Sequence, residues 1–150
     1  MTPRSTSNDA IVQEISINAP AERIFAALTD PDELLRWWRM DDQFRLVRAL
    51  CDLRPGGKWT MRVKGFGDEE QRESIVHGVY VTVEPPFQLI YTWIREEEGH
   101  PETTVRWDLS EFEGSTRVRV THSGLINEGL RARNSGWIFI VRLLQEYVEE

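Results

Sequence analysis

The chain has 150 residues, of which 40% are hydrophobic and 29% charged, and its formal net charge is −7. This length fits one globular domain with its own core, and the composition is typical of a folded protein rather than a disordered one. Because nucleic-acid binding rests on clustered Lys and Arg, the excess of 25 acidic over 18 basic residues argues against a nucleic-acid partner.

Cysteine usage and hydropathy bear on the cellular location. Cys51 is the single cysteine, which excludes an intramolecular disulfide and fits a reducing compartment. No run approaches the roughly 18 consecutive apolar residues of a membrane span, and residues 1–10 lack the hydrophobic core of a signal peptide. We therefore expect a cytoplasmic protein without a membrane span, with a flexible tail at 1–10 and a single domain at 11–150.

The domain is predicted to begin with one strand and two short helices. Residues 11–17 alternate between apolar and polar, which is the period of a half-buried strand. Pro20 is expected at the first position of a helix. That helix has apolar side chains at helical spacing, at Ile24, Phe25 and Leu28. Asp30 as N-cap and Pro31 at the first helical position predict a second helix directly after it.

Residues 44–123 have the pattern of antiparallel strands joined by hairpins. The predicted strands are 44–53, 59–63, 73–83, 89–93, 105–109 and 116–122. Turn residues separate them, among them Arg-Pro-Gly-Gly at 54–57 and a Pro-Pro pair at 85–86, which cannot serve the ladder of a central strand. Apolar and polar residues alternate within the strands, so one face of the sheet is predicted to be dry and the other wet.

The last segment, about 127–147, is predicted to be one long helix. On a helical wheel its apolar face carries Leu130, Trp137, Val141, Leu144 and Val148. Gly136 inside this helix costs about 1 kcal/mol relative to Ala, which a close approach to the sheet or room for a cavity would explain. Ile138 and Phe139 lie off the apolar stripe, so a contact with another element, or a homodimer contact, stays open.

This order of elements predicts an α+β helix-grip fold, in which a curved antiparallel sheet is closed by the C-terminal helix. Strongly curved sheets that grip one helix often leave a pocket between helix and sheet, and the inward-facing side chains here are bulky and aromatic. Buried indole N–H groups also need partners. We predict a ligand-binding cavity lined by Trp38, Trp59, Met61, Tyr91, Trp93, Trp107, His122, Trp137 and Val141.

Five segments carry a resemblance to a known family. They read INAPAERIFAALTDPDELLRWW, LRPGGKW, HGVYVTVEPPFQLIYTW, VTHSGL and the closing GW…LLQEYV. Over about residues 11–147 the chain resembles the SRPBCC (START and birch-pollen-allergen) superfamily, in particular bacterial proteins similar to the C-terminal domain of activators of heat-shock-protein-90 ATPase. The resemblance implies a helix-grip fold with sheet order 1-7-6-5-4-3-2 and a cavity under the last helix, and implies little about a substrate.

Motifs of known catalytic or metal chemistry do not occur in the sequence. It contains no HExxH, CxxC, GxSxG or P-loop, so we expect no metal and no cofactor. His122 is predicted to face the terminal helix, either as a hydrogen-bonded core histidine or as a polar anchor or acid–base group at the cavity mouth. The strand register leaves open whether His77, or Gly78 and Tyr80, faces inward. His100 lies in an acidic loop and is expected to be solvated.

Three functions are compatible with these features. We favour a non-enzymatic protein that binds a small hydrophobic or aromatic molecule. The alternative on the same scaffold is a cyclase- or hydrolase-like enzyme in which His122 and Tyr91 exchange protons with a bound ketone or ester. The third is a stress-linked interaction protein whose partner is a chaperone, the heat-shock protein 90 homologue.

Overall fold

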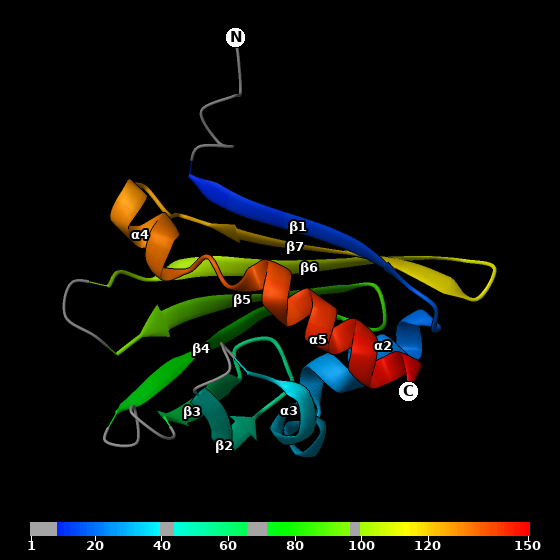
Figure 1. Ribbon diagram of the computed structural model, residues 1–150, viewed down its shortest axis with the longest axis horizontal. Coiled ribbons are helices and arrows are strands. Elements are labelled where there is room, and N and C mark those ends of the chain that lie inside the picture. Colours follow the sequence, from blue (N-terminus) through cyan, green and yellow to red (C-terminus); the bar gives the residue numbers. More distant parts are fainter. Residues whose placement is uncertain (1–8, 40–43, 66–71, 97–99) are drawn as a thin grey trace, which may run out of the picture.

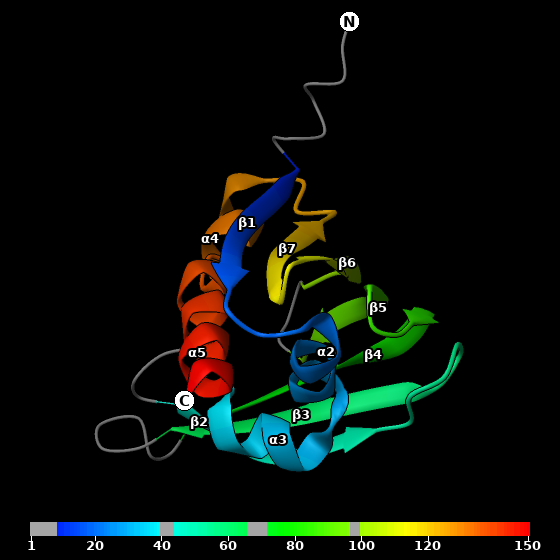
Figure 2. The same ribbon diagram turned by 90° about the vertical axis from the view of Figure 1, so that its right-hand side faces the viewer.

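The computed structural model describes residues 9–39, 44–65, 72–96 and 100–150. Seven strands of this part of the chain form one antiparallel sheet in the expected order β1-β7-β6-β5-β4-β3-β2. They are β1 (Ala10–Ile17), β2 (Phe44–Cys51), β3 (Lys58–Gly65), β4 (Glu73–Glu84), β5 (Gln88–Arg95), β6 (Thr103–Phe112) and β7 (Ser115–Ser123). The helices are α2 (Ala21–Thr29), α3 (Pro31–Trp37), α4 (Glu128–Arg133) and α5 (Trp137–Glu149). The sheet curves around α5, which confirms the α+β helix-grip fold (Figures 1 and 2).

Strand alternation predicts the two faces of the sheet correctly. In β7 the side chains of Val118, Val120 and His122 are buried, whereas Arg117 and Arg119 on the other face are exposed. The register of β4, which the sequence left open, places Gly78 and Tyr80 inside. His77 faces outward, where its Nε2 lies 3.3 Å from a carboxylate oxygen of Glu96.

Gly78 is required by the approach of β4 to β5. A Cβ atom at this position would overlap the carbonyl oxygen of Thr92. The hydroxyl of Thr92 accepts a hydrogen bond from the backbone N–H of Val79 at 2.8 Å. The two strands therefore meet more closely here than a side chain on β4 would allow.

The two short helices form where the sequence predicts them. The side chain of Asp30 accepts a hydrogen bond from the N–H of Asp32 at 2.9 Å, and Pro31 occupies the first position of α3. Pro20 is the N-cap of α2 and so lies one position earlier than predicted. The indole N–H of Trp37 donates to the carbonyl of Ala27 at 2.9 Å, which joins α3 to α2.

The prediction of one terminal helix over 127–147 is wrong, because residues 134–136 interrupt it. The Asn134 side chain donates to the carbonyl of Leu130 at 2.9 Å, while its own backbone N–H bonds to Arg131. The side-chain amide of Asn134 thus takes the place of a backbone N–H at the carbonyl of Leu130, and α4 ends. Gly136 is the N-cap of α5 instead of lying inside a helix.

The helices also cover the two ends of the sheet. α5 packs on β1 and α3 packs on β2. The pairing of β2 with β3 is irregular, with a register shift between Leu46 and Arg48. The apolar core lies between the concave face of the sheet and these helices.

Candidate functional site

The nine residues predicted to line a cavity are all buried between the sheet and α5. They come from β3, β5, β6, β7, α5 and the residue that follows α3. Trp93 lies in the middle of the aromatic set, with its ring centroid 5.4 Å from that of Trp137 and 5.7 Å from that of Trp59. Trp38 adds a further ring, 5.9 Å from Trp137. The aromatic side chains therefore pack largely on one another.

His122 is held by two hydrogen bonds in this cluster. The indole N–H of Trp137 donates to its Nδ1 at 2.9 Å, and its Nε2 lies 2.7 Å from the hydroxyl oxygen of Thr103. Because an indole nitrogen can only donate, the imidazole proton sits on Nε2 and points to Thr103. The Thr103 hydroxyl in turn donates to the carbonyl of Trp93 at 3.0 Å. Both ring nitrogens of His122 are thus used in holding β5, β6, β7 and α5 together.

The protonation of the inner groups favours packing over proton transfer. Burial, with smaller contributions from the charges of His100 and Arg95, lowers the pKa of His122 from 6.5 to about 3. The hydroxyl of Tyr91 accepts a hydrogen bond from the indole N–H of Trp107 at 3.0 Å, and burial raises the pKa of this hydroxyl. At neutral pH both groups are neutral. This arrangement is that of a hydrogen-bonded core histidine.

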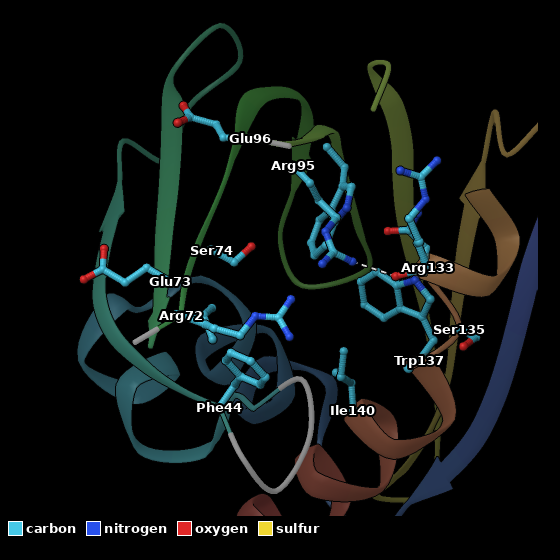
Figure 3. A pocket seen from close by; sticks show the side chains of 14 residues that line it. Phe44, Arg72, Glu73, Ser74, Arg95, Glu96, Arg133, Ser135, Trp137 and Ile140 are labelled. Atoms are coloured by element: carbon cyan, nitrogen blue, oxygen red, sulfur yellow. Dashed lines mark hydrogen bonds between the residues drawn. The ribbon is translucent and has the colours of Figure 1, made fainter. Parts of the chain in front are cut away.

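A cavity of about 490 Å³ lies at the end of the sheet where β3, β4 and β5 meet the α4–α5 junction (Figure 3). Its volume falls in the range of roughly 300–1,000 Å³ that is usual for small-molecule sites. The apolar part of its wall consists of Phe44, Val63, Trp93, Trp137 and Ile140. The rest of the wall consists of Gly136 and of the polar residues Arg72, Glu73, Ser74, Arg95, Glu96, Arg133, Asn134 and Ser135. One site thus combines an aromatic surface with charged and hydrogen-bonding groups.

Arginines and carboxylates have opposite orientations at this cavity. The guanidinium groups of Arg72 and Arg95 point into the space in front of Trp137, whereas the carboxylates of Glu73 and Glu96 point away from it (Figure 3). Arg95 also donates to the carbonyl of Arg133 at 2.6 Å, which ties β5 to the end of α4.

Both carboxylates have positively charged or titratable neighbours outside the cavity. Glu73 forms an ion pair with Arg62 at 2.9 Å, and Glu96 lies against His77. The carboxylates of Glu73 and Glu96 are therefore engaged outside the cavity.

Asn134 is positioned at the cavity by a buried histidine. His100, expected to be solvated, is instead buried, and its Nδ1 donates to the carbonyl of Pro101 at 2.8 Å. With the proton on Nδ1, its Nε2 accepts from the Asn134 amide at 3.1 Å. The same amide nitrogen also bonds to Leu130, so the carboxamide has one orientation.

Asn134 and Trp93, which line the cavity, each carry a buried polar atom that has no hydrogen-bond partner within the described residues. These atoms are the Oδ1 of Asn134 and the Nε1 of Trp93. A buried polar group without a partner costs about 1–3 kcal/mol, so these two atoms reduce the stability of this part of the core.

The sequence predicts part of this site. Of the nine predicted residues, Trp93 and Trp137 line the cavity, and Trp38 lines a second hollow of about 360 Å³ between α3, β2 and the end of α5. A ligand-binding role for the nine stays a prediction. The polar wall was missed, since Arg72 and Arg95 stand at strand ends, where charged residues are usually solvated. Ile138 is 43% exposed, and a homodimer contact there also stays a prediction.

Across residues 9–39, 44–65, 72–96 and 100–150, no three His, Cys, Asp or Glu side chains gather as metal ligands would. None of the described helices combines the length and the apolar character that crossing a bilayer demands.

The chain matches one family model and several solved structures. The model of the family "Activator of Hsp90 ATPase homolog 1-like protein" matches residues 18–149. Among curated proteins, none matches this chain significantly.

Three solved structures illustrate the shared fold. Protein CV1439 from Chromobacterium violaceum is 22% identical, with a TM-score of 0.82 over 95% of this chain and 99% of its own. An AHSA1-like protein from Aeromonas hydrophila is 20% identical, with a TM-score of 0.74 over 93% and 92%. CalU16 from Micromonospora echinospora is 24% identical, with a TM-score of 0.69 over 93% and 75%. At these identities the likeness concerns the fold.

Proposed function

Since the chain belongs to the family of Activator of Hsp90 ATPase homolog 1-like proteins, whose fold commonly binds hydrophobic ligands, we propose that it binds a small hydrophobic or aromatic molecule. The site is the cavity between the sheet and α5 that Trp93 and Trp137 line. The role is binding, without chemical conversion of the ligand.

The observation that carries this proposal is the composition of the cavity wall. Trp137 and Ile140 offer an apolar surface, and the polar residues Ser74 and Ser135 line the same cavity. Small-molecule sites typically pair such an apolar surface with a few fixed polar groups. His122 and Tyr91, the groups considered for acid–base chemistry, are engaged by Trp137, Thr103 and Trp107, which supports binding over catalysis.

Titration with N-phenyl-1-naphthylamine tests the proposal. This neutral aromatic probe gains fluorescence when it leaves water, and we expect saturable binding with one site per chain. Ser74→Trp places a large side chain in the cavity wall and should abolish the signal. Ser110→Trp, on the exposed face of β6, is the matched control and should bind as the parent does. If the parent does not bind, or if both variants bind equally, the proposed site is wrong, provided that thermal unfolding shows both to be folded.

The family match also supports a second candidate, binding to a chaperone of the Hsp90 class. It predicts that the chain co-purifies with the bacterial Hsp90 homologue and raises its ATPase rate. A chain that neither co-purifies nor changes the rate would retire this candidate without affecting the first.

A further inference from the structure

We propose that Trp38 sets the length of the ligand: its indole separates the cavity from the second hollow of about 360 Å³, and a smaller side chain there joins the two into one longer site. This inference rests on the proposed function and adds the residue that selects compact ligands over chain-like ones.

The cavity and the second hollow are neighbours along the same two elements. On β2, Phe44 lines the cavity, and Leu46, two residues later on the same face of the strand, lines the second hollow. On α5, Ile140 lines the cavity and Leu143 lines the second hollow. Phe44 and Ile140 lie on opposite sides of the cavity (Figure 3). Two residues of strand span about 7 Å and three residues of helix about 4.5 Å, so about one layer of side chains fits between the two spaces.

Trp38 belongs to this dividing layer. It is the C-cap of α3, and its buried side chain lines the second hollow. Its ring centroid lies 5.9 Å from that of Trp137 and 6.4 Å from that of Trp93, and both of these residues line the cavity. One indole therefore borders the second hollow and packs against the aromatic wall of the cavity at the same time.

The ring of Trp38 is held by packing. Four other tryptophans donate their indole N–H to a protein acceptor, namely Trp37, Trp59, Trp107 and Trp137. The Nε1 of Trp38 has no such acceptor in the part of the chain that the structure describes. A substitution at Trp38 therefore removes packing and breaks no indole hydrogen bond, so its effect on the ligand reports on the shape of the site.

The position of this indole limits how much of a linear ligand can be buried. While it is in place, the ligand has the cavity of about 490 Å³. Each methylene that enters an apolar site raises the affinity about fourfold, which corresponds to about 0.8 kcal/mol. A straight chain should gain this factor per methylene until its end meets Trp38, and further methylenes should add nothing.

Competition of straight-chain primary alcohols with N-phenyl-1-naphthylamine tests this inference. The readout is the affinity of tetradecanol divided by that of octanol within one variant, so that a general change in affinity cancels. We expect this ratio to be at least about tenfold higher in Trp38→Ala than in the parent, which corresponds to roughly two further buried methylenes. Trp38→Leu leaves a smaller gap in the core and should also raise the ratio, and it replaces Trp38→Ala if thermal unfolding shows that variant to be unfolded.

Two further variants distinguish the partition from a general loosening of the core. Leu35→Ala changes the wall of the second hollow at a residue that is 42% exposed, leaves the partition in place and should keep the ratio of the parent. Leu143→Trp, added to Trp38→Ala, fills the second hollow and should return the ratio to that of the parent.

Each outcome decides one statement. Equal ratios in the parent and in the folded Trp38 variants would overturn the role of Trp38 while the proposed function stands. A ratio that stays high after Leu143→Trp, or that rises equally in Leu35→Ala, would show that the added length does not pass Trp38 into the second hollow, which also overturns the inference. If N-phenyl-1-naphthylamine does not bind the parent chain, the proposed function fails and the inference falls with it.

Discussion

The indole N–H of Trp137 donates to the Nδ1 of His122 over 2.9 Å, so the first residue of α5 is bonded directly to β7. Through Nε2 the same imidazole reaches Thr103 on β6. One buried histidine thus fixes the position of the helix over the sheet, and with it the wall of the cavity.

Thr103→Val should destabilise the protein by about 2–3 kcal/mol. The substitution keeps the shape but removes the oxygen that accepts from His122 and donates to the carbonyl of Trp93, which leaves two buried groups without partners. Urea unfolding measures the change. Thr104→Val, on the opposite face of β6, is the control and should stay within about 0.5 kcal/mol of the parent. Equal effects of the two substitutions would contradict the role of the Thr103 hydroxyl.

The depressed pKa of His122 predicts a loss of stability in acid. In the folded state this pKa is about 3, against 6.5 for an ordinary histidine. At pH values between these two the unfolded chain binds a proton that the folded chain does not. The free energy of unfolding therefore decreases as the pH is lowered through this window, and the contribution of His122 is constant above it.

Urea unfolding of the parent and of His122→Asn at several pH values isolates this contribution. Asparagine keeps an acceptor for Trp137 and does not titrate, so the slope of stability against pH should be smaller in the variant by up to one proton. The other titrating groups, Asp108 with its lowered pKa among them, remain in both chains and cancel in the difference. Identical slopes would mean that His122 takes up its proton equally in both states.

Gly78→Ala should cost about 1–3 kcal/mol, because the added Cβ would overlap the carbonyl oxygen of Thr92 and force β4 away from β5. Gly129→Ala is a useful contrast. Its Cβ would meet its nearest neighbour, the Asn127 side chain, at 3.4 Å inside α4, where alanine is the better helix former, so it should be neutral or slightly stabilising. Thermal unfolding of both variants checks the pair, and a neutral Gly78→Ala would show that the two strands can separate without cost.

Cys51 should react slowly with iodoacetamide in the folded protein. Burial is the main cause that raises the pKa of its thiol, so at neutral pH less of it is present as the reactive thiolate than in an exposed cysteine. The sequence has one cysteine, so mass spectrometry counts a single adduct. The chain in urea should react at the rate of glutathione. A folded chain that reacts as fast as the unfolded one would show that burial does not protect the thiol.

The sequence was sufficient for the features that depend on local patterns. Alternation along β7 placed His122 inside, and Asp30 with Pro31 marked the start of α3, because strand faces and helix caps are encoded within a few residues. The sheet order came from the resemblance, since pairing between distant strands has no local signal.

The parts that failed depend on contacts between distant residues. The helix break at Asn134 involves His100, 34 residues away, and neither residue alone indicates the bond between them. For the same reason His100 looked like a solvated loop residue. The aromatic set was correctly placed in the interior, but Arg72 and Arg95 line one cavity only because β4, which Arg72 precedes, pairs with β5.

The packing of α5 on β1 and of α3 on β2 has a consequence for association between molecules. An open sheet has two terminal strands with unpaired backbone groups, and these invite strands from other chains to add to them. Here each terminal strand is flanked by a helix, and the register shift between Leu46 and Arg48 adds an irregularity to the β2 end. The helices that enclose the core therefore also protect this seven-stranded sheet against edge-to-edge aggregation.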